Sequence, residues 1–314
     1  MRFTRDLVHG VAMGWRNSVI AVACCLALLR LHPLVHADAA LGPTGSIPTG
    51  SIPTGSGELV ASIAGTNLRA FTYRPVRCAP RLLLLVFHGT GRRAAAYRDH
   101  AKQLADRACA IVVAPEFDRE RFPRALYQYG GTAKEEPGRR TIDLVPPLAA
   151  WARAAAGEGA LPFVLLGHSA GAQFLDRVAA FVRTGAAGII IANPSTWVLP
   201  STSIAAPYGF GGTALDTDDA VRAYLAEPVT VLLGTEDTGT KDLAMSPSAM
   251  AQGPNRHARG VHVVRMAQDV ASSHGWRLGW RLAEVPGVGH DATAMFGSAQ
   301  ALEAVRRAVP DAAR

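Results

Sequence analysis

Phe163-Val-Leu-Leu-Gly-His-Ser-Ala-Gly171 sets Ser169 between two glycines, directly after a short apolar run. Such a run is typical of a strand that is covered on both faces, and apolar residues recur at helical spacing after Gly171. A sharp turn from strand to helix holds a serine hydroxyl out at the end of an α/β sheet, and it needs glycine where no Cβ fits. The stretch therefore predicts Ser169 as a nucleophile. A glycine-rich turn without chemistry is the alternative.

Strand and helix patterns alternate along the chain on both sides of this turn. The predicted strands cover residues 68–73, 82–87, 110–114, 163–166, 188–192, 229–233 and 280–285. The predicted helices cover residues 94–108, 141–156, 170–184 and 255–271, and a last one begins near Ser298. This alternation predicts a parallel sheet with helices on both faces, whose ligands bind beyond the carboxyl ends of the strands.

A serine nucleophile needs a base and a carboxylate that orients the base. His290 lies in a glycine-rich loop just past the last predicted strand, and Asp237 lies four residues past the strand before it. The order serine, acid, histidine is the one that this type of sheet requires. Glu236 and Asp242 are the competing carboxylates, and an exposed loop histidine is the alternative for His290. His168 is expected to pack beneath the turn.

Two backbone N–H groups are expected to stabilise the oxyanion of a tetrahedral intermediate. The first belongs to Ala170, the residue after the nucleophile. The second is expected in the loop His88-Gly-Thr-Gly91, which follows a predicted strand and whose small residues let backbone amides approach a carbonyl. Thr90 or Gly91 would supply it. A tight structural turn is the alternative for this loop.

These motifs together resemble the serine hydrolases of the α/β-hydrolase superfamily. The nearest resemblance is to secreted bacterial esterases related to polyhydroxyalkanoate depolymerases and feruloyl esterases, and it covers about residues 68–309. The resemblance implies an α/β-hydrolase fold with a mostly parallel sheet of about eight strands, helices on both faces and a small lid-like insertion. It also implies ester hydrolysis through an acyl-enzyme on Ser169, without a cofactor. The 53 residues from Asp237 to His290 are more than expected, and residues 252–256 have no evident role.

The expected activity is hydrolysis of a small-molecule or polymeric ester. A serine peptidase or amidase on the same fold is one alternative, and a catalytically silent binding module is another. The net charge of +7 is spread along the chain without a basic stripe, which argues against a nucleic-acid partner. The ten histidines and four cysteines lack metal-ligand spacing, and no loop resembles a phosphate cradle, so neither a metal nor a cofactor is expected.

Residues 1–39 have the pattern of a secretory signal peptide. Three arginines precede an uncharged run over residues 18–29, and Ala37 and Ala39 provide small residues for cleavage. The run is short for a membrane span, although an N-terminal membrane anchor is the alternative. The protein is therefore expected to be secreted or periplasmic, with no stable membrane anchor after processing.

The next segment, residues 40–57, contains three copies of Pro-Thr-Gly-Ser and is expected to be a linker. Residues 58–314 then form the α/β-hydrolase domain. Cys78 and Cys109 each precede a predicted strand, at the same edge of the sheet, where a disulfide could form. Two buried free thiols are the alternative.

Two connections, residues 193–228 and 234–279, are long enough to form a lid or the walls of a substrate pocket, or they are inert additions. The second includes an insertion, residues 245–275, of unassigned role. Five aromatic residues are candidates for the acyl pocket, with packing in the core or lid as the alternative: Trp197, Tyr208, Phe210, Trp276 and Trp280.

Overall fold

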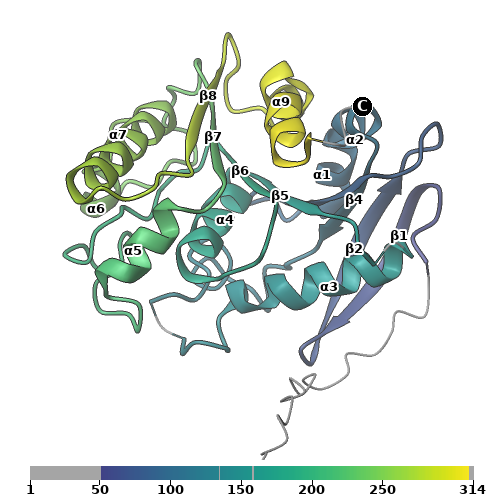
Figure 1. Cartoon of the computed structure of the whole chain (residues 1–314), viewed down its shortest axis with the longest axis horizontal. Coiled ribbons are helices and arrows are strands. Elements are labelled where there is room, and N and C mark those ends of the chain that lie inside the picture. The colour runs from purple at the N-terminus through teal and green to yellow at the C-terminus, as the bar shows by residue number, and fades with distance from the viewer. Residues whose placement is uncertain (1–50, 134, 158, 311–314) are drawn as a thin grey trace, which may run out of the picture. The chain divides into compact units, whose positions relative to one another are not determined.

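The computed structural model describes residues 51–310 except 134 and 158 (Figure 1). The predicted signal peptide and most of the predicted linker lie outside the described residues. Within them the chain forms an eight-stranded sheet in the order β1-β2-β4-β3-β5-β6-β7-β8. The strands are β1 (Gly55–Ile63), β2 (Thr66–Arg74), β3 (Leu82–Phe87), β4 (Ala110–Pro115), β5 (Phe163–His168), β6 (Gly188–Ala192), β7 (Val229–Gly234) and β8 (Arg281–Val285). β2 runs antiparallel to both of its neighbours, and all other pairs are parallel.

Helices cover both faces of the sheet. One face carries α1 (Ala94–His100), α2 (Lys102–Ala108), α8 (Ala292–Gly297) and α9 (Ala299–Ala308). The other carries α3 (Val145–Ala156), α4 (Ala170–Phe181), α5 (Asp218–Leu225) and α7 (Arg256–His274). The remaining short elements are the 3₁₀ helix η1 (Thr141–Leu144) and α6 (Pro247–Met250). The predicted fold class, a mostly parallel sheet between two helical layers, is confirmed.

The centre of the sheet explains the continuous apolar runs in the sequence. In β3, Leu83, Leu85 and Phe87 pack in the core beneath α3 and α4, while the alternate residues pack against the other helical layer. A strand that is buried on both faces needs apolar residues at every position. This is why β3 and β5 were predicted from the pattern alone.

The edge of the sheet differs from the prediction. β1 was not predicted, and it begins at Gly55, inside the stretch expected to be linker. Its residues alternate between exposed positions and positions that are half-buried or buried, with Val60 57% exposed, so the strand has no apolar run. Ile52, also in the expected linker, is buried, and its N–H donates to the carbonyl of Ala155 at 2.8 Å.

The helical predictions were right in position but not in every boundary. The helix expected over residues 94–108 is interrupted at Ala101, which separates α1 from α2. The helix expected over residues 141–156 starts as η1, and α3 begins at Val145, with the two prolines in its first turn, where proline is tolerated. The short helices α5, α6 and α8 were missed.

The turn between β5 and α4 is as tight as its glycines suggested. Ser169 has φ 58°, a left-handed value that is unusual for a residue with a side chain. A Cβ on Gly167 would lie 2.5 Å from the carbonyl oxygen of Gly171, and one on Gly171 would collide with the carbonyl of Phe87. Glycine at both positions therefore lets α4 lie directly against β3 and β5.

We expect Gly171→Ala to destabilise the fold by about 3 kcal/mol, because the added Cβ meets backbone that can move only by distorting β3. Urea unfolding followed by circular dichroism measures this loss. Gly159→Ala is the matched control, since a Cβ there meets nothing within 4 Å. Equal unfolding midpoints for the two variants would contradict the close approach of α4 to β3.

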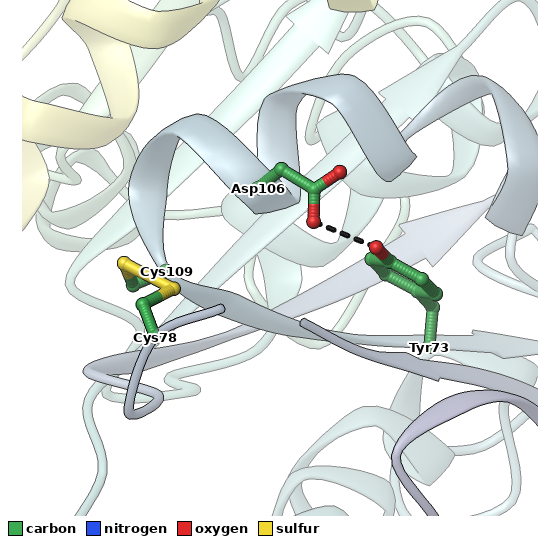
Figure 2. Close-up of a disulfide and its surroundings, with 4 residues drawn as sticks. All are labelled: Tyr73, Cys78, Asp106 and Cys109. Carbon is green, nitrogen blue, oxygen red and sulfur yellow. Dashed lines mark hydrogen bonds between the residues drawn. A yellow bond between two sulfur atoms is a disulfide. The ribbon is translucent and has the colours of Figure 1, made fainter. Parts of the chain in front are cut away.

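Cys78 and Cys109 form a disulfide with their Cα atoms 5.8 Å apart, as the positions of the two strands suggested (Figure 2). It links the segment before β3 to the residue between α2 and β4. On the same side of the sheet, the Tyr73 hydroxyl donates a 2.6 Å hydrogen bond to Asp106, so β2 and α2 are joined as well. The amino end of the sheet is thus cross-linked near its antiparallel edge.

Replacing both cysteines by serine should lower the free energy of unfolding by about 3 to 4 kcal/mol, from the entropy of closing a loop of this length. Denaturant unfolding of the oxidised and variant proteins tests this. Dithiothreitol should shift the wild-type midpoint toward that of the variant and leave the variant unchanged. A variant as stable as the oxidised wild type would be the contrary result.

In the region that the structure describes, no helix has both the length and the apolar character that a bilayer span requires.

Candidate active site

Ser169 is held by the sheet and faces a histidine from the last strand's loop. Its backbone N–H donates to the carbonyl of Ala192 at 3.0 Å, which fixes the turn against β6. Its Oγ lies 3.0 Å from Nε2 of His290. The serine and the histidine, 121 residues apart in the sequence, are thus in hydrogen-bond contact.

The other imidazole nitrogen of His290 contacts a carboxylate. Nδ1 lies 2.7 Å from Oδ2 of Asp237, a residue that is 2% exposed on the loop after β7. With Nδ1–H donating to the carboxylate, Nε2 is left free to accept the Ser169 proton. Glu236 and Asp242, the competing carboxylates, are both exposed. The structure therefore brings together Ser169, His290 and Asp237, the three residues predicted from the sequence.

Asn193 positions the two loops that carry the histidine and the acid, and the sequence reasoning missed it. It lies directly after β6, fully buried and with φ 48°. Its Oδ1 accepts from the N–H of Gly234 at 2.9 Å, and its Nδ2 donates to the carbonyl of Gly289 at 3.3 Å. Asparagine tolerates positive φ better than most residues, so an asparagine directly after a predicted strand is the signal that could have found it.

His168 packs beneath the turn, as expected. It is 2% exposed, its ring lies 4.5 Å from the ring of His290, and its Nδ1 lies 3.3 Å from the Tyr97 hydroxyl. Burial, and next the proximity of His290, lowers the pKa of His168 well below its usual value. The imidazole therefore stays uncharged, and it supports His290 without adding a positive charge to the site.

The loop after β3 is fixed by a second neutral histidine. Nε2 of His88 accepts from the N–H of Phe117 at 3.0 Å, so its Nδ1–H donates to the carbonyl of Gly89, also at 3.0 Å. Burial lowers the pKa of His88 to about 4, which keeps this pattern intact at neutral pH. Arg92 adds hydrogen bonds to the carbonyls of Phe117 and Phe122, at 2.9 and 2.7 Å. The loop is therefore held in one conformation from both ends.

Backbone N–H groups are available beside the serine. Ala170 is the first residue of α4, where an N–H has no partner within the helix. Within the described part of the chain, the N–H groups of Thr90 and Gly91 donate to no other residue. Thr90 and Gly91 line the same cavity as Ser169. The three predicted donors are thus free to bind an oxygen of a ligand.

The cavity at Ser169 has a volume of about 340 Å³. Its walls are mostly polar, and they comprise Gly89, Thr90, Gly91, Arg93, Tyr97, His100, His168, Ser169, Asp242, His290, Asp291, Ala292 and Thr293. A second cavity of about 340 Å³ lies against β8 and α9, and none of the predicted site residues lines it. The cavity at Ser169 is therefore the one that can hold a substrate for this serine.

The aromatic residues proposed for an acyl pocket do not line this cavity. Trp197 and Phe210 are fully buried in the core and Trp280 is 6% exposed. The Tyr208 hydroxyl contacts the hydroxyls of Tyr129 and Ser246, and Trp276 stacks on His274. These aromatic residues therefore serve in packing, which was the alternative. Apolar side chains in the long connections attach those connections to the core.

The insertion that had no evident role ties the two long connections together. The Gln252 side chain accepts from the N–H of Trp197 and donates to its carbonyl, both at 2.9 Å. Arg259 donates to the carbonyls of Ser195 and Ala244. The Asn255 side chain caps the start of α7 by accepting from Ala258. These buried contacts hold the two connections against each other.

Among the described residues, no group of three or more histidine, cysteine, aspartate or glutamate side chains could hold a metal ion.

No known family model matches the sequence, and no curated protein matches it either. Solved structures do match. The chain is 31% identical to LpqC, a poly(3-hydroxybutyrate) depolymerase from Bordetella parapertussis, over 81% of this chain and 95% of that one, with a TM-score of 0.74. It is 30% identical to poly(aspartic acid) hydrolase-1 from Sphingomonas sp. KT-1, over 79% of this chain and 98% of that one, with a TM-score of 0.73. The siderophore hydrolase EstB from Aspergillus nidulans shares the fold, at 16% identity, a TM-score of 0.51, and coverage of 83% and 98%.

The two more similar structures are matched over nearly their whole length. The strand order and the tight turn at Ser169 agree with it. The chain belongs to the α/β-hydrolase superfamily, and it is a hydrolase.

Proposed function

We propose that the protein is an exported serine hydrolase that cleaves carboxylic esters through an acyl-enzyme on Ser169. The observation that carries the proposal is the chain of hydrogen bonds from Ser169 through His290 to the buried Asp237, at 3.0 and 2.7 Å. Ser169 and His290 line a cavity together with Thr90 and Gly91, whose backbone N–H groups have no hydrogen-bond acceptor among the described residues. Nucleophile, base, orienting acid and oxyanion donors are the complete set that acyl transfer requires.

The reaction follows from this geometry. Ser169 Oγ attacks the ester carbonyl while its proton passes to Nε2 of His290, and Asp237 stabilises the imidazolium. The N–H groups of Ala170 and of Thr90 or Gly91 bind the tetrahedral oxygen. The imidazolium then gives its proton to the leaving alkoxide, and the acyl group stays on the serine. A water molecule, deprotonated by His290, attacks the acyl-enzyme and releases the acid.

The walls of the cavity favour a small or polar acyl group. Within the described residues Arg93 forms no ion pair or hydrogen bond through its guanidinium, so it is free to contact a substrate oxygen. Few apolar side chains are present to bind a long alkyl chain. The depolymerase that shares 31% identity acts on poly(3-hydroxybutyrate), a polyester of a short hydroxy acid. We propose short-chain esters and polyesters of hydroxy acids as the substrate class.

Amide hydrolysis is the second candidate function. One structure that shares 30% identity is a poly(aspartic acid) hydrolase, and poly(aspartic acid) is joined by amide bonds. The same residues can perform either reaction, because only the leaving group differs.

A substrate panel on the purified full chain tests both candidates. We expect kcat/KM for p-nitrophenyl acetate and butyrate to exceed that for the dodecanoate at least tenfold, and release of acid from 3-hydroxybutyrate oligomers. Faster cleavage of p-nitroanilides or of poly(aspartic acid) than of any ester would favour the amidase. A folded protein that turns over none of these compounds would support the silent binding module.

Export is proposed from the sequence of residues 1–39, and the disulfide supports it. Disulfides persist in oxidising compartments outside the cytoplasm. Expression of the full chain in a bacterium, followed by N-terminal sequencing of the periplasmic protein, should find a start close to residue 40. An uncleaved protein in the cytoplasm or membrane fraction would contradict export.

A further inference from the structure

A buried arginine contacts the carboxylate that orients His290. While Oδ2 of Asp237 bonds to the imidazole, Nη1 of Arg256 lies 3.4 Å from Oδ1, the other carboxylate oxygen. Both side chains of this ion pair are 2% exposed. The carboxylate is therefore shared between an imidazole on one side and a guanidinium on the other.

Arg256 also holds the loop that carries Asp237. Its Nη2 donates to the carbonyl of Lys241 at 2.8 Å, and the N–H of His257 donates to the backbone carbonyl of Asp237 at 3.4 Å. Arg256 is the first residue of α7, whose start is fixed by the Asn255 cap. The start of α7 thus holds both the side chain of Asp237 and the backbone of the loop after β7.

The contact between Arg256 and Asp237 is important because both side chains are buried. An ionised carboxylate loses its hydration when it is buried, and it keeps its charge only when it is paired and hydrogen-bonded. The guanidinium pairs with Asp237 whether or not His290 is protonated. It therefore holds the carboxylate in place both before and after the imidazole takes the serine proton.

We propose that Arg256 is a positioning residue that acts through Asp237, fixing the orientation of that carboxylate and thereby of the His290 imidazole that it contacts. The inference rests on the proposed function, because it assigns a role within the same set of residues.

The test compares kcat and KM of Arg256→Met and wild type on p-nitrophenyl butyrate. Active molecules are counted by titration with a fluorophosphonate. We expect kcat to fall about 10²-fold with KM changed less than threefold, because the carboxylate moves and the substrate does not touch Arg256. Arg256→Lys should lower kcat less than Arg256→Met does, since an ammonium group can still pair with the carboxylate.

Arg259→Met is the matched control. Arg259 lies one turn further along α7 and is fully buried. Among the described residues it donates to backbone carbonyls and to the Met250 sulfur and has no hydrogen bond to Asp237. A general disturbance of α7 would lower the stability of both variants, but kcat should fall about 10²-fold only in Arg256→Met.

A double variant separates an effect through Asp237 from any other. In an Asp237→Asn background, Arg256→Met should change kcat less than threefold, because the charge that the guanidinium pairs with is already gone. Full additivity, an unchanged kcat in Arg256→Met, or an equal loss of kcat in Arg259→Met would overturn the inference. If Arg256→Met does not fold, the same cycle is run with Arg256→Lys, and full additivity of Arg256→Lys and Asp237→Asn would overturn it. Failure of the proposed function looks different, because the wild type itself would then hydrolyse no ester.

Discussion

Ser169→Ala should lower kcat/KM for p-nitrophenyl butyrate by about 10⁵- to 10⁶-fold. The variant loses the only atom that can form the acyl-enzyme, and the activity left would come from the oxyanion donors and substrate binding alone. The fold should persist, since among the described residues the Ser169 hydroxyl is hydrogen-bonded only to His290 and the glycines that shape the turn remain. Initial rates on the purified variant measure the loss of activity. Its circular dichroism spectrum, compared with that of the wild type, shows whether the fold persists.

Ser273→Ala is the control for this prediction, because Ser273 is exposed at the end of α7 and contacts only its own helix. It should keep wild-type rates within twofold. If Ser169→Ala retained a tenth of the wild-type activity, a different nucleophile would have to be sought.

Asp237→Asn should reduce kcat by about 10⁴-fold with little change in KM. The amide of the asparagine can donate to Nδ1. The proton of the neutral imidazole would then be on Nε2, and Nε2 could not accept the proton of Ser169. The amide also cannot stabilise the imidazolium. Rates at saturating and limiting substrate separate kcat from KM, and they distinguish this loss from a change in binding.

Glu236→Gln is the matched control for the acid. Glu236 is adjacent in the sequence but exposed, and its backbone N–H donates to the carbonyl of Val288 whatever its side chain. We expect wild-type rates within twofold. A large loss in Glu236→Gln together with an active Asp237→Asn would reverse the assignment of the acid.

The residues that we propose to react with the substrate could be predicted from short-range patterns in the sequence. The turn at Ser169 needs glycine at two nearby positions, and the loops with Asp237 and His290 each follow an apolar strand. Parallel strands bring such loops to one edge, so the contact follows from topology although the residues are far apart in sequence. This is why the spacing of 53 residues from Asp237 to His290 did not prevent the contact.

The residues that hold this set in place could not be predicted in the same way. Asn193 and Arg256 act through contacts that exist only after distant loops have packed, and neither belongs to a recurring local pattern. The same reason explains why the sequence left both a pocket and the core open for Trp197 and Phe210. An aromatic residue in a glycine- and proline-rich connection has the same local signal in a core as in a pocket. β1 was missed for a different reason, since an edge strand with one exposed face carries little apolar signal.

The most direct test of the central claim is mass spectrometry of the protein after reaction with a fluorophosphonate. Such a reagent phosphonylates a serine only when a base and oxyanion donors activate it. The account predicts one adduct per chain, on the peptide that contains Ser169, and no adduct on Ser169→Ala. An enzyme that hydrolyses esters while Ser169 stays unmodified, or that carries its adduct on another residue, would contradict it.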